Sequence, residues 1–392
     1  MTDKQSNHGK IDTILTHSGR KPEENWGIVN PPVYHASTIL FPNTKELIEP
    51  TQKYRYGRRG TPTVDAMLAV LDDMEGAHQS FVAASGLAAI ALAYMSCVKA
   101  GDHVLVADNV YFPNRNFCNT FLTRMGVTTT YFDPLDLEAL AGLFKDNTRV
   151  VFLESPGSLT FEMTDIPAIA ALAHERGAAV LMDNTWATPL FFKPLDHGVD
   201  ISVMAGTKYL VGHSDAMFGT VSANERTAAQ IHEVNGVLGN SVGPDDIYLA
   251  LRGARTLGVR LRQHMRSGLE IARWLESRQE VARVYHPGLE SHAGHGLWKR
   301  DFTGASGLFS FEMATEREDA VHAFLDSLKL FGLGYSWGGF ESLAIWARWQ
   351  ASRTASRPDI KGPLIRLHVG LEDIDDLKAD LEQALDRCRP EL

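Results

Sequence analysis

The sequence predicts an α/β protein built around a mostly parallel β-sheet. Between about residues 61 and 255, short apolar segments alternate with segments whose apolar residues recur at helical spacing. HVLVAD (103–108) and RVVFLES (149–155) are largely apolar runs, as is typical of parallel strands that are covered on both faces. Strands separated by helices of about 10–15 residues favour right-handed β–α–β units and a parallel sheet.

The predicted elements follow this alternation along the chain. A helix is predicted at 63–75, because Val64, Leu68 and Leu71 recur at helical spacing. The segment FVAASGLAAIALAYMSCV then passes from a strand, through Ser85 and Gly86, into an alanine-rich helix. The later predicted strands are 103–108, 128–133, 149–155, 178–184 and 200–207, and the helices between them are 114–125, 136–144 and 165–177.

The two ends of the chain differ from this middle part. WGIVNPPVYHASTILFP has three prolines and is too apolar for a solvated tail, so we expect it to lie along another surface. A long amphipathic helix at about 258–278 leads to strands at 307–313 and 364–371 and helices at 317–328 and 373–388. We therefore predict an arm (1–60), a large domain (61–256) and a smaller α/β domain (257–392).

Composition excludes several classes of function. The formal net charge is 38 − 48 = −10, which disfavours nucleic acid or an anionic membrane as a partner. No apolar run reaches the ~18 residues of a membrane span, and the first ten residues lack the apolar core of a secretory signal. Three cysteines without C-x-x-C spacing argue against a disulfide framework or a cysteine zinc site, so a reducing cytoplasm is expected.

Three predicted strand ends carry chemistry, because ligands of open α/β sheets bind beyond the carboxyl ends of strands. The turn around Gly86 leads into a helix whose N-terminus could bind phosphate, although a tight packing turn gives the same pattern. Asp183 follows an apolar strand and could serve a ligand or cap a helix. Lys208 also follows a strand and could be a desolvated amine or a lysine that reaches out to solvent.

Together the phosphate site, the acid and the amine match the three attachment points of pyridoxal phosphate. An acid that keeps the pyridine nitrogen protonated makes the ring an electron sink, and a lysine forms the Schiff base. Asp183 precedes Lys208 by 25 residues, on the preceding predicted strand, so both side chains can reach one ring.

The chain resembles the trans-sulfuration family of pyridoxal-phosphate enzymes, and most closely its cystathionine β-lyase branch. The resemblance runs from about Thr16 to the C-terminus. Its motifs occur in order: YRYGRRGTPT (54–63), ASGLAA (84–89), ESPGS (154–158), DNTWATP (183–189), GTKYLVGHSD (206–215), GYSWGGFESL (334–343) and IRLHVGLED (365–373).

The resemblance implies an architecture as well as a cofactor. It implies the aminotransferase-like fold (fold type I), with a mostly parallel seven-stranded sheet in the large domain and a smaller C-terminal α/β domain. It also implies an arm that reaches into the neighbouring subunit, and a homotetramer made of two dimers with shared active sites.

The resemblance further implies roles for individual residues. Lys208 would form the Schiff base and shuttle protons, Asp183 would pair with the pyridine nitrogen, and Tyr111 would stack on the ring and assist proton transfer. The other implied cofactor contacts are backbone N–H groups of Gly86 and Leu87, the hydroxyl of Thr207, and Tyr56 and Arg58 from the neighbouring subunit.

On the substrate side, Arg366 would bind the α-carboxylate, bordered by Ser336 and Trp337. Ser155, Pro156 and Ser158 would lie near the cofactor face. One departure from the family is Ala205, where many relatives carry serine, so a phosphate hydroxyl is absent there.

The reaction expected from the resemblance is α,β-elimination of L-cystathionine to homocysteine, pyruvate and ammonia. Enzymes of the family that act at Cγ tend to carry glutamate where this chain has Tyr335. A γ-lyase, γ-synthase or sulfhydrylase is the nearest alternative, and a non-catalytic regulator that senses an amino acid is a remote one.

Two other classes of function are disfavoured. His292 and His295 have metal-like spacing, but no third ligand is suitably placed, so we interpret them as loop histidines and predict no metal site. A dinucleotide dehydrogenase would require G-x-G-x-x-G after a strand, and no predicted strand is followed by that motif.

Overall fold

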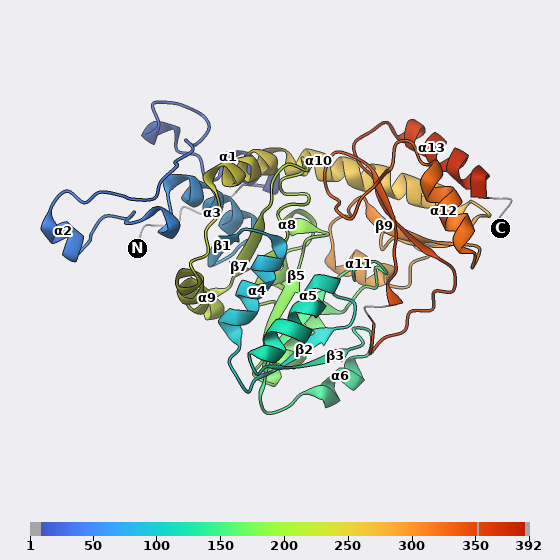
Figure 1. Ribbon diagram of the computed structural model, residues 1–392, viewed down its shortest axis with the longest axis horizontal. Helices are drawn as coiled ribbons and strands as arrows, with labels where there is room; N and C mark the ends of the chain where they lie inside the picture. The colour runs from blue at the N-terminus through green and yellow to red at the C-terminus, as the bar shows by residue number, and fades with distance from the viewer. Residues whose placement is uncertain (1–8, 351–352, 389–392) are drawn as a thin grey trace.

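A seven-stranded sheet forms the centre of the computed structural model, which describes residues 9–350 and 353–388 (Figure 1). Its strands are β1 Gln79–Ala83, β2 His103–Ala107, β3 Thr128–Phe132, β4 Thr148–Glu154, β5 Ala179–Asp183, β6 Ile201–Met204 and β7 Gly219–Ala223. Their order is β1-β7-β6-β5-β4-β2-β3, with β7 antiparallel to both of its neighbours and the other pairs parallel. The predicted α/β class with a mostly parallel sheet is confirmed.

Helices cover this sheet. They are α3 Pro62–Glu75, α4 Gly86–Cys97, α5 Phe112–Phe117, α6 Leu137–Leu143, α7 Ile166–Glu175, α8 Thr188–Phe191 and α9 Glu225–Leu238. All of them except α5 and α8 begin at a side-chain cap. The Asp165 carboxylate accepts a hydrogen bond from the Ala168 N–H at 3.3 Å and so caps α7. Thr61 caps α3 in the same way, and Pro62 occupies its first turn.

Three elements of the large region, β7, α8 and α9, were not predicted. β7 (GTVSA) consists largely of small and polar residues, which carry little strand signal, although it is buried between β1 and β6. α9 follows it directly and has low mean hydropathy, so its apolar face is weakly marked in the sequence.

The long helix α10 (Pro244–Glu276) joins the large region to a second, smaller one (Figure 1). It begins 14 residues before the predicted start at 258, because Pro244 opens the helix in its first turn and the helical pattern continues unbroken. The predicted boundary at 256 therefore falls inside this helix, and the division of the chain at 60 and 256 stays a prediction.

The smaller region contains a five-stranded sheet of order β10-β11-β12-β9-β8. Its strands are β8 Val281–Tyr285, β9 Leu308–Met313, β10 Gly332–Leu333, β11 Leu343–Trp346 and β12 Leu364–His368, and its helices are α11 His295–Asp301, α12 Glu318–Ser327 and α13 Ile374–Cys388. The predicted elements at 307–313, 317–328, 364–371 and 373–388 correspond to β9, α12, β12 and α13. The other four elements were not predicted.

Residues 9–60 have little regular structure apart from α1 (Ile11–His17), α2 (Thr44–Ile48) and two short 3-10 turns. Arg255 of α10 holds the end of α1 by donating to the carbonyl oxygens of Leu15 at 2.6 Å and Ser18 at 2.8 Å. Beyond this point the arm projects from the body (Figure 1) and exposes apolar side chains, including Trp26 (93% exposed) and Leu40 (84%).

No helix within residues 9–350 or 353–388 has both the length and the apolar character that a membrane crossing requires.

Candidate active site

A cavity of about 260 Å³ lies where the large and small regions meet. The carboxyl ends of β4 and β5 and the turn after β6 form its floor, as expected for an open α/β sheet. It brings together the predicted residues Gly86, Leu87, Tyr111, Asp183, Thr207, Lys208, Tyr335, Trp337 and Arg366. Ser336 reaches the same site through Lys208.

Lys208 lies in the turn after β6 and points toward the small region. Its ammonium donates a 2.8 Å hydrogen bond to the Ser336 hydroxyl and lies 5.2 Å from the centre of the Trp337 ring. Burial lowers the pKa of Lys208 to about 8; the positive charge of Arg366 adds to this, and Asp183 opposes it. A substantial fraction of this amine is therefore neutral near pH 8, which a base or nucleophile requires.

Asp183 ends β5 and is 9% exposed. Its carboxylate accepts hydrogen bonds from both the N–H and the hydroxyl of Thr185. Burial raises the pKa of Asp183, although the Thr185 hydrogen bonds and the charge of Lys208 act in the opposite direction. No described cation lies within ion-pair distance of this carboxylate, so a cationic group brought by a ligand would find an available partner.

The N-terminus of α4 faces the same cavity. The Ser85 hydroxyl accepts the Ala88 N–H at 3.1 Å, while the N–H groups of the first turn have no intrahelical acceptor. A Cβ atom at Gly86 would lie 2.5 Å from the Cβ of Ala205, so this close approach requires glycine at position 86 and a small residue at 205. Ala205 therefore packs against Gly86, in the turn expected to bind phosphate, and has no hydroxyl to offer a ligand there.

The Thr207 hydroxyl is engaged more fully than its predicted role implies. It accepts the Phe218 N–H at 2.9 Å and donates to the Phe218 carbonyl oxygen at 3.1 Å. The lone pairs of the hydroxyl oxygen still allow contact with a ligand, but its proton is already used.

Arg366 lies on β12 and is 7% exposed. One terminal nitrogen donates to the carbonyl oxygens of Tyr335 at 2.9 Å and Ser336 at 3.2 Å, which fixes the guanidinium beside the cavity. Its Nε atom is buried and has no acceptor among the described residues. Burial lowers the pKa of Arg366 to about 10, so it stays charged at neutral pH and can receive a carboxylate.

Tyr335 and Trp337, the two residues of the 334–343 motif expected on the substrate side, are placed differently within one chain. Trp337 packs near Tyr209, with their ring centres 5.5 Å apart. The ring of Tyr335 is 88% exposed and stands at the rim. Within one chain, Trp337 is therefore the aromatic residue of this pair that closes the cavity.

Tyr111 lies at the start of α5, where its backbone N–H donates to Glu154 at 2.7 Å. Burial raises the pKa of its phenol, and the negative charges of Asp183 and Glu154 add to this effect. The phenol therefore keeps its proton at neutral pH.

Glu154 is a cavity residue that the sequence analysis missed. It ends β4 and pairs in register with Asp183 of β5, so two carboxyl groups share one end of the sheet. Burial raises the pKa of Glu154 well above its usual range, and the charge of Asp183 adds to this effect. The signal was present, because Glu154 is an acid at a strand end, as Asp183 is.

Of the predicted residues in the ESPGS loop (154–158), some line the cavity and one does not. Pro156 and Ser158 line the cavity. The Ser155 hydroxyl instead accepts the Thr164 N–H at 3.0 Å and is turned into its own loop.

Tyr56 and Arg58 do not join this cavity within one chain. Arg58 donates to the carbonyl oxygen of Gly236 at 3.2 Å and lines a separate cavity of about 480 Å³ beside the arm. Their predicted contact with the phosphate of a neighbouring subunit stays a prediction.

His292 lies in the loop before α11, and His295 is the first residue of that helix. The Gly294 N–H donates to His292 at 3.0 Å, and His295 lies 3.0 Å from the carbonyl oxygen of Pro287. In the described part of the chain, no three His, Cys, Asp or Glu side chains gather as a metal site would require.

The cavity residues fit pyridoxal phosphate. Lys208 offers an amine of lowered pKa, and Asp183 offers a buried carboxylate that lacks a cation. Gly86 and the free N–H groups of α4 offer room and hydrogen-bond donors for a phosphate.

Comparison with known proteins agrees with this donor set. The family model described as "Cys/Met metabolism PLP-dependent enzyme" matches residues 12–386. A Rhizobium johnstonii protein that is named provisionally as a cystathionine β-lyase is 54% identical over 389 residues, covering 98% of each chain. The cystathionine β-lyase of Escherichia coli K12 is 44% identical over 390 residues, covering 96% of this chain and 98% of the relative.

Among solved structures, the crystal structure of cystathionine γ-synthase from Xanthomonas oryzae pv. oryzae, in complex with aminoacrylate and cysteine, has a TM-score of 0.92. It is 32% identical in sequence and covers 98% of this chain and 100% of its own.

Proposed function

Because the chain belongs to the Cys/Met metabolism family of PLP-dependent enzymes, we propose that it is a carbon–sulfur β-lyase that cleaves L-cystathionine to homocysteine, pyruvate and ammonia. The observation that carries this proposal is a single cavity shared by Lys208, Asp183 and Arg366, in a chain 44% identical to a cystathionine β-lyase over nearly its whole length.

Four groups would hold the cofactor. Lys208 would bind its aldehyde carbon and Asp183 would pair with its pyridine nitrogen. The backbone N–H groups of Gly86 and Leu87 would bind its phosphate. When bound, pyridoxal phosphate supplies a protonated ring that withdraws electrons from the substrate Cα.

Arg366 orients the substrate by binding its α-carboxylate. Its buried Nε lacks an acceptor, and carbonyl oxygens of the 334–336 loop hold the rest of the guanidinium, so the donors are fixed before the substrate arrives. Such a fixed pair of donors would set the direction of the Cα–H bond, which determines whether that bond can break.

Lys208 takes the Cα proton in this proposal. The lowered pKa supports the neutral form of the amine, and the 2.8 Å hydrogen bond to Ser336 supports a defined position for Nζ. The Cβ–S bond then breaks with its electron pair on sulfur. The protonated phenol of Tyr111, which lines the same cavity, can donate a proton to the departing thiolate.

The β-lyase assignment is favoured over the γ-elimination and γ-replacement alternatives by what lines the substrate side. Reactions at Cγ require a second proton to be removed, from Cβ, and Tyr335 stands where many such enzymes carry glutamate. Trp337 and the exposed ring of Tyr335 offer no second base there.

Product analysis tests the assignment. Purified protein saturated with pyridoxal phosphate is incubated with L-cystathionine, and the keto acid and thiol are identified by mass spectrometry. Pyruvate with homocysteine is expected. 2-Oxobutyrate with cysteine would assign γ-elimination instead, and the absence of both pairs would remove cystathionine as the substrate.

We also propose that the chain assembles as a homotetramer in which the arm completes a neighbour's active site. The exposed apolar residues of the arm support this, because a group of them marks a surface that a partner covers; they include Trp26, Ile28, Val29, Leu40, Leu47 and Ile48. Light scattering coupled to size exclusion should give a mass near four chains. The cytoplasmic location stays a prediction.

A further inference from the structure

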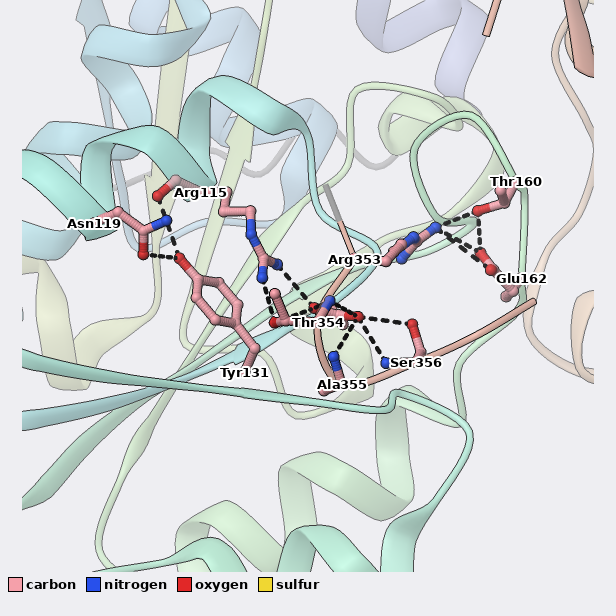
Figure 2. Close-up of polar contacts among 10 residues, drawn as sticks. Arg115, Asn119, Tyr131, Thr160, Glu162, Arg353, Thr354, Ala355 and Ser356 are labelled. Carbon is pink, nitrogen blue, oxygen red and sulfur yellow. Dashed lines mark hydrogen bonds and ion pairs between the residues drawn. The ribbon is translucent and has the colours of Figure 1, made fainter. Parts of the chain in front are cut away.

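A short segment of the small region, residues 353–356, lies against the large region beside the active-site cavity (Figure 2). It belongs to the connection between β11 and β12, and β12 carries Arg366. In Figure 2, Thr354 lies beside Arg115 of α5, with Ala355 and Ser356 next to it, while Arg353 points toward Thr160 and Glu162.

The centre of this contact is Asp108, which directly follows β2 and is fully buried. Its carboxylate accepts the backbone N–H groups of Thr354, Ala355 and Ser356 at 3.0, 2.9 and 2.7 Å. It also accepts the Ser356 hydroxyl at 2.9 Å and the Arg115 guanidinium at 2.8 Å. A single carboxylate thus binds three successive N–H groups of another region, as an anion binds in a backbone nest.

The charges at this contact are balanced. Burial alone would raise the pKa of Asp108, but the hydrogen bonds from Ser356, Arg115, Thr354 and Ala355 outweigh it and hold the pKa below its usual value. The Arg115 guanidinium lies 3.6 Å from the centre of the Tyr131 ring, which fixes it from the other side. Asp108 is therefore an ionised, saturated acceptor.

A second contact of the same segment is made with the loop after β4, part of which lines the cavity. Arg353 is 3% exposed and donates to the Thr160 hydroxyl and to Glu162. These two residues follow Pro156 and Ser158, which line the cavity. Residues 353–356, which we call the clasp, therefore join the strand that bears Arg366 to the loops after both β2 and β4.

The turn held by the clasp is the one that presents Tyr111. Its four residues, 108–111, are fixed from outside at three positions. Asp108 binds the clasp, the carbonyl oxygen of Asn109 accepts the Ser158 N–H at 2.8 Å, and the Tyr111 N–H donates to Glu154 at 2.7 Å. Asp108 itself does not line the cavity, so its effect on the reaction must be indirect, and the turn that carries Tyr111 is its shortest covalent connection to the cavity.

We propose that Asp108 is a positioning residue for the reaction: by fastening the clasp to the end of β2, it holds Tyr111 against the cavity and couples that position to the region carrying Arg366. The proposal rests on the role of Tyr111 in the proposed function.

The test combines proteolysis with a double-mutant cycle. In Asp108→Asn, the amide NH₂ faces N–H donors, so the clasp should detach. Trypsin should then cut after Arg353, which is buried in the wild type, whereas the bond after Arg357 is protected by Pro358 in both proteins.

We expect kcat/KM to fall about 10–100-fold, as the loss of a charged, buried hydrogen-bond network implies. In a Tyr111→Phe background, the further fall should be less than about threefold, because the hydroxyl being positioned is gone.

A matched control is Asp200→Asn. Asp200 is equally buried and accepts the Val180 N–H at 2.9 Å and the Asn224 amide at 2.8 Å, but it lies at the opposite end of the sheet. It should leave Arg353 protected and combine multiplicatively with Tyr111→Phe. If Asp108→Asn fails to fold, Ser356→Ala removes one donor and should show the same coupling at smaller size.

Three results would overturn the proposal. Arg353 could stay protected in Asp108→Asn, or the effects of Asp108→Asn and Tyr111→Phe could multiply fully; either result would reject the positioning role while leaving the proposed function intact. If Tyr111→Phe alone kept wild-type activity, the role of Tyr111 in the proposed function would fall together with this proposal.

Discussion

The cavity and the N-terminal arm hold their predicted functional residues in opposite ways. Asp183 and Arg366 are buried, and Lys208 is hydrogen-bonded to Ser336, all by contacts within one chain. Tyr56, by contrast, is 45% exposed on an arm that projects from the body. A site assembled by one chain can be described from a single copy, whereas a site completed by a neighbour leaves the contributed residues, here Tyr56 and Arg58, on an uncovered surface.

The largest expected effect on the cavity residues is that of Lys208→Ala. We expect activity to fall at least about 10³-fold, because the variant loses both the amine that holds the cofactor and the base for the Cα proton. Pyruvate formation measures the rate, and the visible absorbance of the protein measures bound cofactor. Lys99→Ala, an exposed lysine before β2, should behave as wild type. A Lys208→Ala enzyme with a tenth of normal activity would refute the assignment.

Arg366→Lys tests the second buried contact. We expect KM for L-cystathionine to rise about 10–100-fold, because lysine cannot reproduce the planar pair of guanidinium donors. Initial rates at varied substrate measure the change. Arg300→Lys is the matched control, since Arg300 makes a two-pronged contact with Asp165 at 2.8 and 3.0 Å on the surface. An unchanged KM in Arg366→Lys would move the carboxylate site elsewhere.

Hybrid oligomers test whether the exposed arm completes the buried site. Lys208→Ala and Arg58→Ala, each inactive or impaired alone, are co-expressed with different tags and purified together. If the active site is shared, hybrid dimers contain one intact site, and about a quarter of wild-type activity should return after random pairing. The control pair Lys208→Ala with Asp183→Ala should restore nothing, because both residues come from the same chain. No recovery in the first pair would place Arg58 outside the neighbour's site.

The smallest expected effect is the dependence of kcat on pH, which the cavity residue Lys208 should set. Because the pKa of Lys208 is lowered to about 8, the neutral amine increases as the pH rises through that value. We expect kcat to rise severalfold between pH 7 and 9 with a midpoint near 8, measured by pyruvate formation at saturating substrate. A midpoint that remained near 8 in Ser336→Ala would separate the effect of burial from that of the hydrogen bond.

The sequence predicts the strand ends of the large region well, because buried parallel strands are apolar throughout and their ends are marked by Gly86, Asp183 and Lys208. Glu154 obeys the same rule and could have been found by applying it to every strand. β7 could not be found in this way, because its glycine, threonine and serine residues gain their burial from neighbouring strands and not from an apolar pattern.

The contacts that the sequence could not predict are the long-range ones. Asp108 and Ser356 are 248 positions apart, and neither residue carries a local signal of the other. The Thr207 hydroxyl was expected at the phosphate, yet its proton goes to Phe218 across a turn whose geometry depends on β7. Roles of this kind follow from tertiary contacts, which residue spacing does not encode.

The helix α10 has a mechanical consequence for the whole chain. Its 33 residues span about 50 Å, and it supplies Leu257 and Leu261 to the first hydrophobic core and Ile271 and Leu275 to the second. Fraying this helix at either end exposes apolar surface in both cores, so the two regions should melt together in one cooperative transition. A cavity cut into the second core by Leu275→Ala would then lower the melting temperature of the first core as much as that of its own.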